Sequence, residues 1–303
     1  MTEDNHERWA DELARHPNFR VIRRLDASRA GPTLEGATVR RAAIVDTETT
    51  GTDPSRDKVI ELAIVVVEYC AERGILGRAL GAYDGLEDPG MPIPASATAI
   101  HGITDEMVKG QRLDEAAIAQ LMNGVEFVIA HNAGFDRKML EARLPGFAEL
   151  PWACSFREVA WAEAGIESGK LEYIAYRCGF FYEGHRADID CRALLEVLQK
   201  PLGESGSTAF QRVLESVSEP SYRVWATGSA FETKDVLKRR GHYWNAEKRC
   251  WNREVRGEAA LQAELAWLKE AVFGGRGATV EVETIDARVR YSERPGKIEK
   301  VRL

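Results

Sequence analysis

The stretch Ala42-Ala43-Ile44-Val45-Asp46-Thr47-Glu48-Thr49-Thr50-Gly51 decides the fold of this chain. Four small or β-branched apolar residues precede Asp46, which predicts a buried strand. Because side chains alternate across a strand, Asp46 and Glu48 point to the same side of the sheet. Two such carboxylates repel each other and lose hydration, so a cation must sit between them or a basic partner must pair with them. Mg²⁺ and Mn²⁺ prefer oxygen ligands of this kind. The alternative is a solvated turn after the strand, because Asp, Thr and Gly are ordinary turn residues.

The length and the charge distribution predict two parts. The 303 residues suffice for a domain of about 200 residues with a real core and for a smaller module. The net charge is −7, but residues 219–303 carry 17 Lys and Arg against 13 Asp and Glu, which leaves 24 against 35 in the remainder. If the partner is a polyanion, the second part is expected to supply much of the attraction.

Membrane and secretory signals are missing from the sequence. No apolar run reaches the length of about 18 residues that a membrane span needs, and the N-terminus is acidic and polar. Five scattered cysteines without a Cys-x-x-Cys pair are expected to be reduced and buried. These features predict a cytoplasmic protein.

The order of the expected elements indicates a mixed α/β sheet. Strands at 42–46, 59–70 and 74–83 follow one another closely, so we expect antiparallel hairpins. Strands at 127–130 and 152–155 alternate with helices, which is typical of α/β architecture. The helices are expected at 113–122, 136–144, 156–164, 171–178, 188–198 and 209–217. At the N-terminus we expect a helix at 7–15, an edge strand at 19–25 and a linker at 27–38.

Four carboxylates and one histidine lie at element ends. Asp136 follows an expected strand, and Asp190 starts a long helix with His185 five residues before it. Together with Asp46 and Glu48 they fit a two-metal site for phosphoryl hydrolysis, in which the ions stabilise the attacking and leaving oxygens. A general base must deprotonate the attacking water, and an imidazole suits that task at neutral pH. His185 is therefore the candidate base.

Three ordered motifs carry a resemblance to a known family. They are Asp46-Thr47-Glu48-Thr49-Thr50-Gly51, His131-Asn132-Ala133-Gly134-Phe135-Asp136 and the His-x-x-x-x-Asp pattern from His185 to Asp190. This set resembles the DEDDh, or DnaQ-like, 3′–5′ exonucleases, which include the proofreading epsilon subunit of bacterial DNA polymerase III. The likeness covers Arg41 to Pro201 and includes Ile100-His101-Gly102-Ile103-Thr104.

The resemblance implies a ribonuclease H-like fold, a mixed sheet flanked by helices, with two Mg²⁺ or Mn²⁺ ions. It implies that His185 is the general base. It also implies that Asp46 bridges both ions and that Asp136 acts on the second, often through water. Backbone groups of Thr49 and Thr50, with His101 nearby, would bind the terminal nucleotide. The implied metal ligands are Asp46, Glu48, Asp136 and Asp190.

We therefore expect a metal-dependent 3′–5′ exonuclease that releases nucleoside 5′-monophosphates, with single-stranded DNA 3′ ends as the substrate. DNA is preferred because Asp-Thr-Glu-Thr-Thr-Gly best matches the proofreading type. One alternative is an RNA-trimming exoribonuclease, since the sequence has no recognisable sensor of the 2′-hydroxyl. The other is a non-catalytic nucleic-acid-binding or adaptor protein, which would ordinarily have lost an acid. No polymerase or other protein partner can be identified.

Several residues receive a structural interpretation. Asp188 departs from the family pattern, which usually has an apolar residue at this position, and we expect it to cap the following helix rather than to bind metal. His131 is expected to be structural. Trp152 and Trp161 are flanked by apolar residues and are expected in the core.

The sequence of the tail, residues 219–303, predicts a small α+β domain. We expect strands at 222–225, 279–284 and 287–291, a hairpin over 243–251, and helices at 234–240 and around 265–272. The chain is thereby divided into an N-terminal extension at 1–40, an exonuclease domain at 41–201, a linker and helix at 202–220, and a basic, aromatic α+β domain at 221–303.

The tail also carries a basic, aromatic run. Residues 234–256 contain eight Lys and Arg against three acids. Basic residues with aromatic faces fit a platform for single-stranded nucleic acid. The alternative is that the aromatic rings form the domain's core and the charges its solvated rim. The candidate binding residues are Lys234, Lys238, Arg239, Arg240, Tyr243, Trp244, Arg249 and Trp251.

Overall fold

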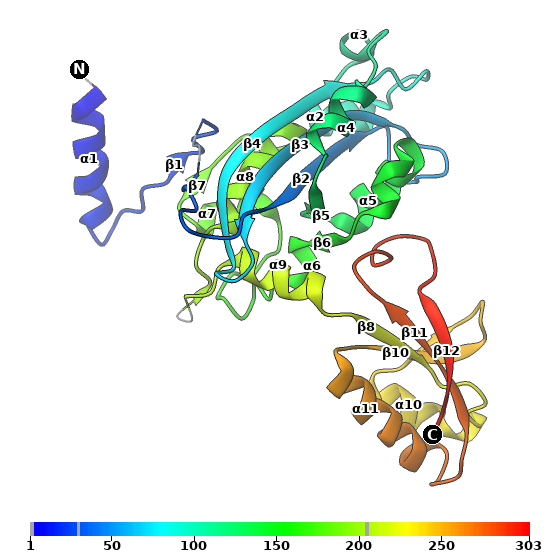
Figure 1. The fold of residues 1–303 in the computed structure, drawn as a ribbon. Helices are drawn as coiled ribbons and strands as arrows, with labels where there is room; N and C mark the ends of the chain where they lie inside the picture. The colour runs from blue at the N-terminus through cyan, green and yellow to red at the C-terminus, as the bar shows by residue number, and fades with distance from the viewer. Residues whose placement is uncertain (1–2, 29–30, 204–205) are drawn as a thin grey trace.

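The protein is built on a five-stranded mixed sheet in the order β4-β3-β2-β5-β6 (Figure 1). The computed structural model describes residues 3–28, 31–203 and 206–303. β2 pairs antiparallel with β3 and parallel with β5, so the strand that carries Asp46 lies at the centre. The expected mixed α/β sheet is confirmed. The strands are β2 (Arg40–Thr49), β3 (Val59–Cys70), β4 (Ile75–Leu86), β5 (Val125–Ala130) and β6 (Trp152–Cys154).

Helices cover both faces of this sheet, which is why β2 is apolar on both sides before its acids. Ile44 packs with residues of α7, α8 and α9, whereas its neighbour Val45 packs with residues of α4, α5 and the short 3-10 helix η1. Both side chains are fully buried. The helices are α4 (Glu115–Leu121), α5 (Ala133–Arg143), η1 (Pro145–Glu149), α7 (Leu171–Arg177), α8 (Ala187–Leu198) and α9 (Ala209–Ser218).

Two segments differ from the sequence-based expectation. The helix expected at 156–164 is only α6 (Ser155–Glu158), because the chain turns extended at Val159 and the indole of Trp161 donates to the carbonyl of Ser155 at 2.8 Å. Helix α9 belongs to the main core rather than to a free connection, since Phe210 packs against Tyr69 and Phe127. Trp152 and Trp161 are buried as expected, and all five cysteines are free thiols, four of them buried.

The N-terminal segment has little regular structure beyond one helix. Helix α1 (Glu3–Arg15) stands away from the sheet in Figure 1. The expected edge strand shrinks to β1 (Arg23–Arg24), which pairs in parallel with β7 (Phe180–Phe181). Residues 1–2, 29–30 and 204–205, which belong to the expected extension and linkers, lie outside the described residues. Among the helices that are described, none has the length and apolar content to cross a membrane.

The tail forms a second five-stranded sheet in the order β12-β11-β8-β10-β9. Helices α10 (Lys234–Arg240) and α11 (Glu258–Trp267), continued by the π-helical turn η4 (Leu268–Val272), pack on one face. The short 3-10 helix η3 (Phe231–Thr233) precedes α10. The strands are β8 (Ser221–Trp225), β9 (Tyr243–Asn245), β10 (Cys250–Arg256), β11 (Thr279–Ile285) and β12 (Lys297–Arg302).

The prediction of a strand at 287–291 was wrong. This segment forms turns, and the last strand is β12, which the sequence did not indicate. The reason is a contact with the first sheet, because the amide of Trp152 on edge strand β6 donates to the carbonyl of Ala287 at 2.7 Å. The fully buried guanidinium of Arg137 on α5 binds the carbonyls of Ala287, Arg288 and Arg290. The backbone polar groups of the segment are therefore satisfied by the first part of the chain rather than by a strand partner.

Candidate active site

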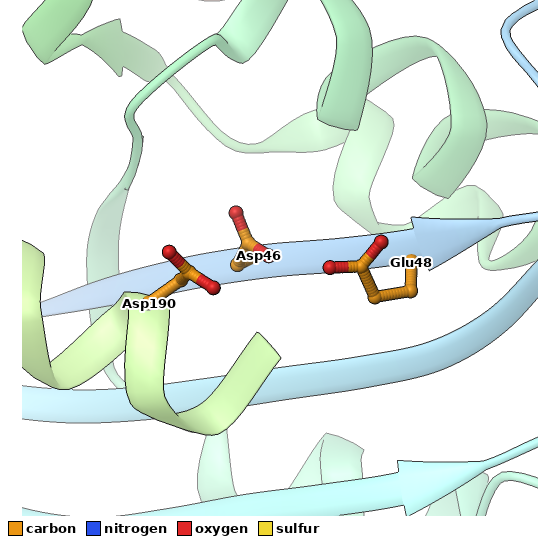
Figure 2. A group of neighbouring side chains, drawn as sticks. All are labelled: Asp46, Glu48 and Asp190. Atoms are coloured by element: carbon orange, nitrogen blue, oxygen red, sulfur yellow. The ribbon is translucent and has the colours of Figure 1, made fainter. Parts of the chain in front are cut away.

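Three carboxylates converge where β2 ends. Asp46 and Glu48 lie two residues apart on β2, and Asp190 lies in the first turn of α8, which crosses beside them (Figure 2). One oxygen from each of the three can be chosen so that all lie within 4.8 Å of one another. The alternation of β2 and the start of α8 thus bring together acids that are separated by more than 140 residues.

Asp190 is held in place by its own surroundings. The hydroxyl of Tyr182 donates to Oδ1 at 3.1 Å, and the amide of Arg186 donates to Oδ2 at 3.2 Å. Both donors come from the loop before α8, so the loop and the helix start fix the carboxylate together. Its pKa is raised to about 6, mainly by burial, against the lowering effect of these hydrogen bonds.

Asp136 is buried on α5 but does not join the three-acid group. Its Oδ1 accepts hydrogen bonds from the amide and the hydroxyl of Thr47, at 3.1 and 2.8 Å. Thr47 lies on the opposite face of β2 from Asp46. The two carboxylates still repel each other across the strand, which helps to raise the pKa of Asp46. The structure therefore brings together three of the four expected metal ligands. The fourth, Asp136, lies nearby and is hydrogen-bonded to Thr47 instead.

The site is electrostatically costly without a cation. Burial, followed by repulsion from the other acids, raises the pKa of Asp46 well above its usual range. The same causes raise the pKa of Glu48 to about 8, and burial raises that of Asp136 to about 7. Carboxyl groups that resist ionisation at neutral pH need an external positive charge to become anions.

The donor set fits a hard divalent metal. It offers carboxylate oxygens alone, which is the chemistry that Mg²⁺ and Mn²⁺ prefer. Among the described residues, no Lys or Arg forms an ion pair with Asp46, Glu48 or Asp190. Arg186 lowers the pKa of Glu48, but its guanidinium is bound to Glu61. The negative charge of the three acids is therefore not neutralised by a described Lys or Arg, and a bound cation could neutralise it.

Glu61 is a site residue that the sequence interpretation missed. It lies opposite Glu48 on β3 and is fully buried. Its carboxylate accepts from Nε and Nη2 of Arg186 at 2.9 and 2.6 Å, and from the amide of Ala187 at 3.0 Å. It thereby ties the loop of His185 and the first residue of α8 to the central sheet. The signal in the sequence was a lone acid within the apolar run 59–67.

His185 lies at the rim of the site. Its φ of 67° is in the left-handed region, where a non-glycine residue is uncommon and costly. The side chain is 54% exposed, and its Nε2 lies 3.5 Å from Oε1 of Glu172 on α7. The imidazole is accessible and faces a carboxylate, which is the arrangement that orients a proton-transferring histidine.

The turn after β2 is held closed by Asp57. This carboxylate accepts from the amide of Asp53 at 2.8 Å and from the hydroxyl of Thr50 at 3.4 Å. A Cβ on Gly51 would come within 2.5 Å of it, so the turn requires glycine at that position. The hydroxyl of Thr49 donates to the carbonyl of Gly51 at 2.6 Å. Both threonine side chains are therefore engaged within the turn.

His101, at the end of α2 (Ala95–His101), offers an unused donor. Its Nδ1 accepts from the amide of Ile103 at 3.0 Å, which places the proton of the neutral ring on Nε2. Nε2 is buried and has no partner among the described residues. Burial lowers the pKa of His101, which favours this neutral form. Thr104 is the N-cap of the next helix, α3 (Asp105–Val108).

Two further expectations can be compared with the structure. Asp188 does not cap α8, because Arg186 occupies the cap position and Asp188 lies in the first turn, 3.9 Å from Arg192. It also lies outside the three-acid group. His131 has the expected structural role, since its ring nitrogens bond the hydroxyl of Ser155 and the carbonyl of Gly169 at 2.8 and 2.7 Å.

The tail's basic residues are largely engaged within the tail. Arg240 is bound to the buried carboxylate of Glu264, and Arg239 donates to the carbonyl of Asp235. Lys234 lies over the ring of Phe231 and Lys238 over that of Trp251. Arg249, at the β9–β10 turn, has a φ of 50°.

The tail's aromatic residues divide between exposed and partly buried positions. Tyr243 and Trp244 on edge strand β9 are half exposed. Trp251 packs at the border of the second core and contacts Trp244 edge to face. The tail therefore presents two half-exposed rings on β9, while Trp251, with Lys238 over it, is mainly structural.

The comparisons with known proteins decide the family. The model of the exonuclease family matches residues 43–198, which is more than half of the chain. The chain belongs to the exonuclease family. This agrees with the DnaQ-like resemblance of the motifs and makes the protein a nuclease enzyme.

Two relatives show how far the similarity extends. Exodeoxyribonuclease 10 of Escherichia coli strain K12 is 30% identical over 200 residues, which cover 64% of this chain and 82% of the relative. The PolC-type DNA polymerase III of Thermotoga maritima is 24% identical over 207 residues. This match covers 64% of the chain but only 15% of that polymerase. A solved structure of exonuclease X with 5′ overhanging duplex DNA is 28% identical, covers 57% of this chain and 97% of its own, and has a TM-score of 0.44.

The raised pKa values predict a pH-dependent stability of the metal-free protein. Because the folded state binds protons to Glu48, Asp136 and Asp190 up to about pH 8, 7 and 6, whereas the unfolded chain releases them near pH 4, stability should fall as the pH rises through this window. The melting temperature in EDTA should decrease between about pH 5 and about pH 8, and added Mn²⁺ should raise it most at about pH 8.

Asp46→Asn is the matched control for this measurement. It removes one of the repelling charges, so its melting temperature in EDTA should depend less on pH and should gain less from Mn²⁺. If the wild-type and Asp46→Asn proteins show the same pH dependence and the same gain from Mn²⁺, the acids are not a strained metal site.

Proposed function

We propose that the protein is a metal-dependent 3′–5′ exonuclease that hydrolyses the terminal phosphodiester bond of single-stranded DNA and releases nucleoside 5′-monophosphates. The observation that carries this proposal is the convergence of Asp46, Glu48 and Asp190 within 4.8 Å, at the end of a central strand, without a basic partner among the described residues. Such a group has the chemistry needed to hold a divalent metal beside a phosphate. Membership of the exonuclease family supports the reaction class.

Each acidic residue of the site has a proposed role in metal binding. Asp46, Glu48 and Asp190 would hold Mg²⁺ or Mn²⁺, and Asp136 would contribute to holding a second ion. When bound, the ions supply positive charge to the attacking oxygen, the leaving oxygen and the phosphate. Thr47 keeps Asp136 oriented through its two hydrogen bonds, and Tyr182 does the same for Asp190.

His185 is the proposed general base. Its Nε2 faces Glu172, so its Nδ1 would take a proton from the attacking water and later release it to solvent, which the exposed position of the ring allows. Glu172 would orient the ring and stabilise the imidazolium. Glu61 acts as a positioning residue, because it holds the loop of His185 through Arg186.

The terminal nucleotide would lie against the turn after β2. Backbone groups of Thr49 and Thr50 are proposed to bind the 3′-hydroxyl and the sugar, since their side chains are engaged within the turn. His101 is proposed to support this nucleotide from behind the turn, because its buried ring interacts with the backbone of Thr49. The name of the Escherichia coli relative supports DNA over RNA, and an RNA 3′ end is the alternative substrate.

The tail is proposed to raise affinity for the strand. It carries an excess of basic residues, whereas the remainder of the chain is acidic and repels nucleic acid outside the metal site. Tyr243 and Trp244 are half exposed and could stack on bases. Lys234, Lys238, Arg239 and Arg249 would add positive charge, whereas Arg240 is bound to Glu264 and Trp251 has mainly a structural role.

The direction of digestion tests the proposal most simply. With Mg²⁺ or Mn²⁺, a 3′-labelled strand should release labelled mononucleotide at once, whereas a 5′-labelled strand should shorten stepwise. EDTA and Asp46→Asn should each abolish release. Release of mononucleotide from the 5′ end, or full activity in EDTA, would contradict the proposal, and parallel RNA strands decide the sugar preference.

Replacement of the proposed base should affect turnover rather than binding. His185→Ala should lower kcat by about 10²–10⁴ with little change in KM, because general-base catalysis acts in the transition state. The matched control is His16→Ala, an exposed histidine after α1, which should keep wild-type kcat. A loss of less than about tenfold in His185→Ala would assign proton removal to another group.

A further inference from the structure

A cleft lies between the second sheet and the nuclease part of the chain. Its volume is about 830 Å³, which is at the upper end for ligand pockets. One wall is formed by the turn after β2 and the start of α5, and the other by β8, β10 and the segment after β11. No catalytic acid lines it, so the cleft is a separate space from the metal site.

The second sheet turns its uncovered face to this cleft. On β8, Tyr222 and Val224 face the helices of the tail, whereas Ser221 and Arg223 lie on the opposite face and line the cleft. The helices α10 and α11 are thus on the far side of the sheet. The surface that the cleft presents is different from the basic, aromatic run of the tail.

The lining of the cleft is basic although the whole chain is acidic. Five cationic side chains line it against two acids, Glu158 and Glu254. The five are Lys138, Arg157, Arg223, Arg256 and Arg290. A basic cleft in a protein of net charge −7 is a local attraction for polyanions.

Two of these cations are available to a ligand. Arg157 is exposed, and its guanidinium makes no hydrogen bond or ion pair to any described residue. Lys138 is partly exposed and has only a 3.5 Å contact with exposed Glu293. The other three are held by the fold, since Arg290 binds Glu158, Arg256 lies 3.6 Å from Glu158, and Arg223 binds Glu254 and Glu283.

The cleft begins where the catalytic turn ends. Thr52 and Pro54 lie in the turn that follows Gly51, and Asn132, the N-cap of α5, and Phe135 precede Asp136. The N-terminus of α5, an eleven-residue helix, also borders the cleft and favours anions. A strand whose last nucleotide lies at the turn after β2 would meet these residues next. Phe135 and Tyr291 add aromatic surface to the lining.

We propose that this cleft binds the single strand on the 5′ side of the scissile nucleotide, with its phosphodiester backbone against Lys138 and Arg157. The inference rests on the proposed exonuclease function and deepens it by giving the path of the substrate. It makes the second sheet one wall of the binding site. The chemistry that the cleft would recognise is a phosphodiester backbone, which DNA and RNA share, so both kinds of strand are tested.

The experiment compares two charge-matched double variants. Lys138→Gln/Arg157→Gln removes two positive charges from the cleft, and Arg73→Gln/Arg276→Gln removes two from exposed turns outside it. Binding of a fluorescent single-stranded oligonucleotide is measured by anisotropy in EDTA at several salt concentrations. Thermal melting checks that each variant is folded.

The cleft variant should bind the strand at least about tenfold more weakly than wild type, because it loses charge-assisted contacts. The slope of log affinity against log salt should fall by roughly 0.7 for each lost phosphate contact. The control variant should bind like wild type. Equal loss in both variants, or no loss in the cleft variant, would overturn the inference.

A one-nucleotide substrate separates this inference from the proposed function. Thymidine 5′-monophosphate p-nitrophenyl ester needs the catalytic centre but is too short to reach the cleft. The cleft variant should hydrolyse it at the wild-type rate while its KM for long strands rises. If the wild-type enzyme degrades neither the ester nor a strand, the proposed function fails. If Lys234→Gln/Arg239→Gln weakens strand binding and the cleft variant does not, the strand follows the outer face of α10 and the cleft inference is wrong.

Discussion

The repulsion among partly buried carboxylates at the end of β2 is the constraint on which the site depends. A central strand with helices on both faces partly buries Asp46, and α8 brings Asp190 beside it. A protein gains nothing in stability from such a cluster, because each acid loses hydration and repels the next. A bound cation would offset this cost, so the cluster supports the proposed metal dependence of the nuclease.

The surrounding residues hold this cluster in one geometry. Thr47 anchors Asp136, Tyr182 anchors Asp190, and Glu61 ties the loop of His185 to β3. Removal of one partner would leave a buried polar group unsatisfied, which costs more than the hydrogen bond gained when it forms. The acids are therefore preorganised by neighbours that touch no substrate.

The second sheet is attached mainly by polar contacts, with Tyr291 also packing against the core of the first sheet. The buried Arg137 binds three carbonyls of the segment after β11, and the hydroxyl of Tyr291 donates to Glu158 at 2.9 Å. The amide of Trp152 bonds Ala287, so the segment also covers the open edge of the main sheet at β6. Covering this edge removes a site at which another chain could pair. It also fixes the wall of the cleft.

Local patterns in the sequence predicted the centre of the fold and the identities of the acids. The apolar run before Asp46 and the alternation of β2 are local properties, so they could be read without a structure. Glu61 could not be assigned, because its role depends on the register between β2 and β3 and on the loop before α8.

The errors in the tail have the same physical origin. The segment 287–291 alternates like a strand, but its carbonyls are bound by Arg137, about 150 residues away. The sequence also lacked a signal for β12 (Lys297–Arg302), because its side chains are mostly exposed and charged. In both the 287–291 segment and β12, the backbone conformation depends on tertiary contacts rather than on the local sequence pattern.

The most direct measurement is an anomalous-scattering map of crystals soaked in Mn²⁺. The account predicts a peak in contact with the carboxylates of Asp46, Glu48 and Asp190, which disappears in Asp46→Asn crystals. A map with no peak at these three acids, at a Mn²⁺ concentration that supports nuclease activity, would contradict the central claim.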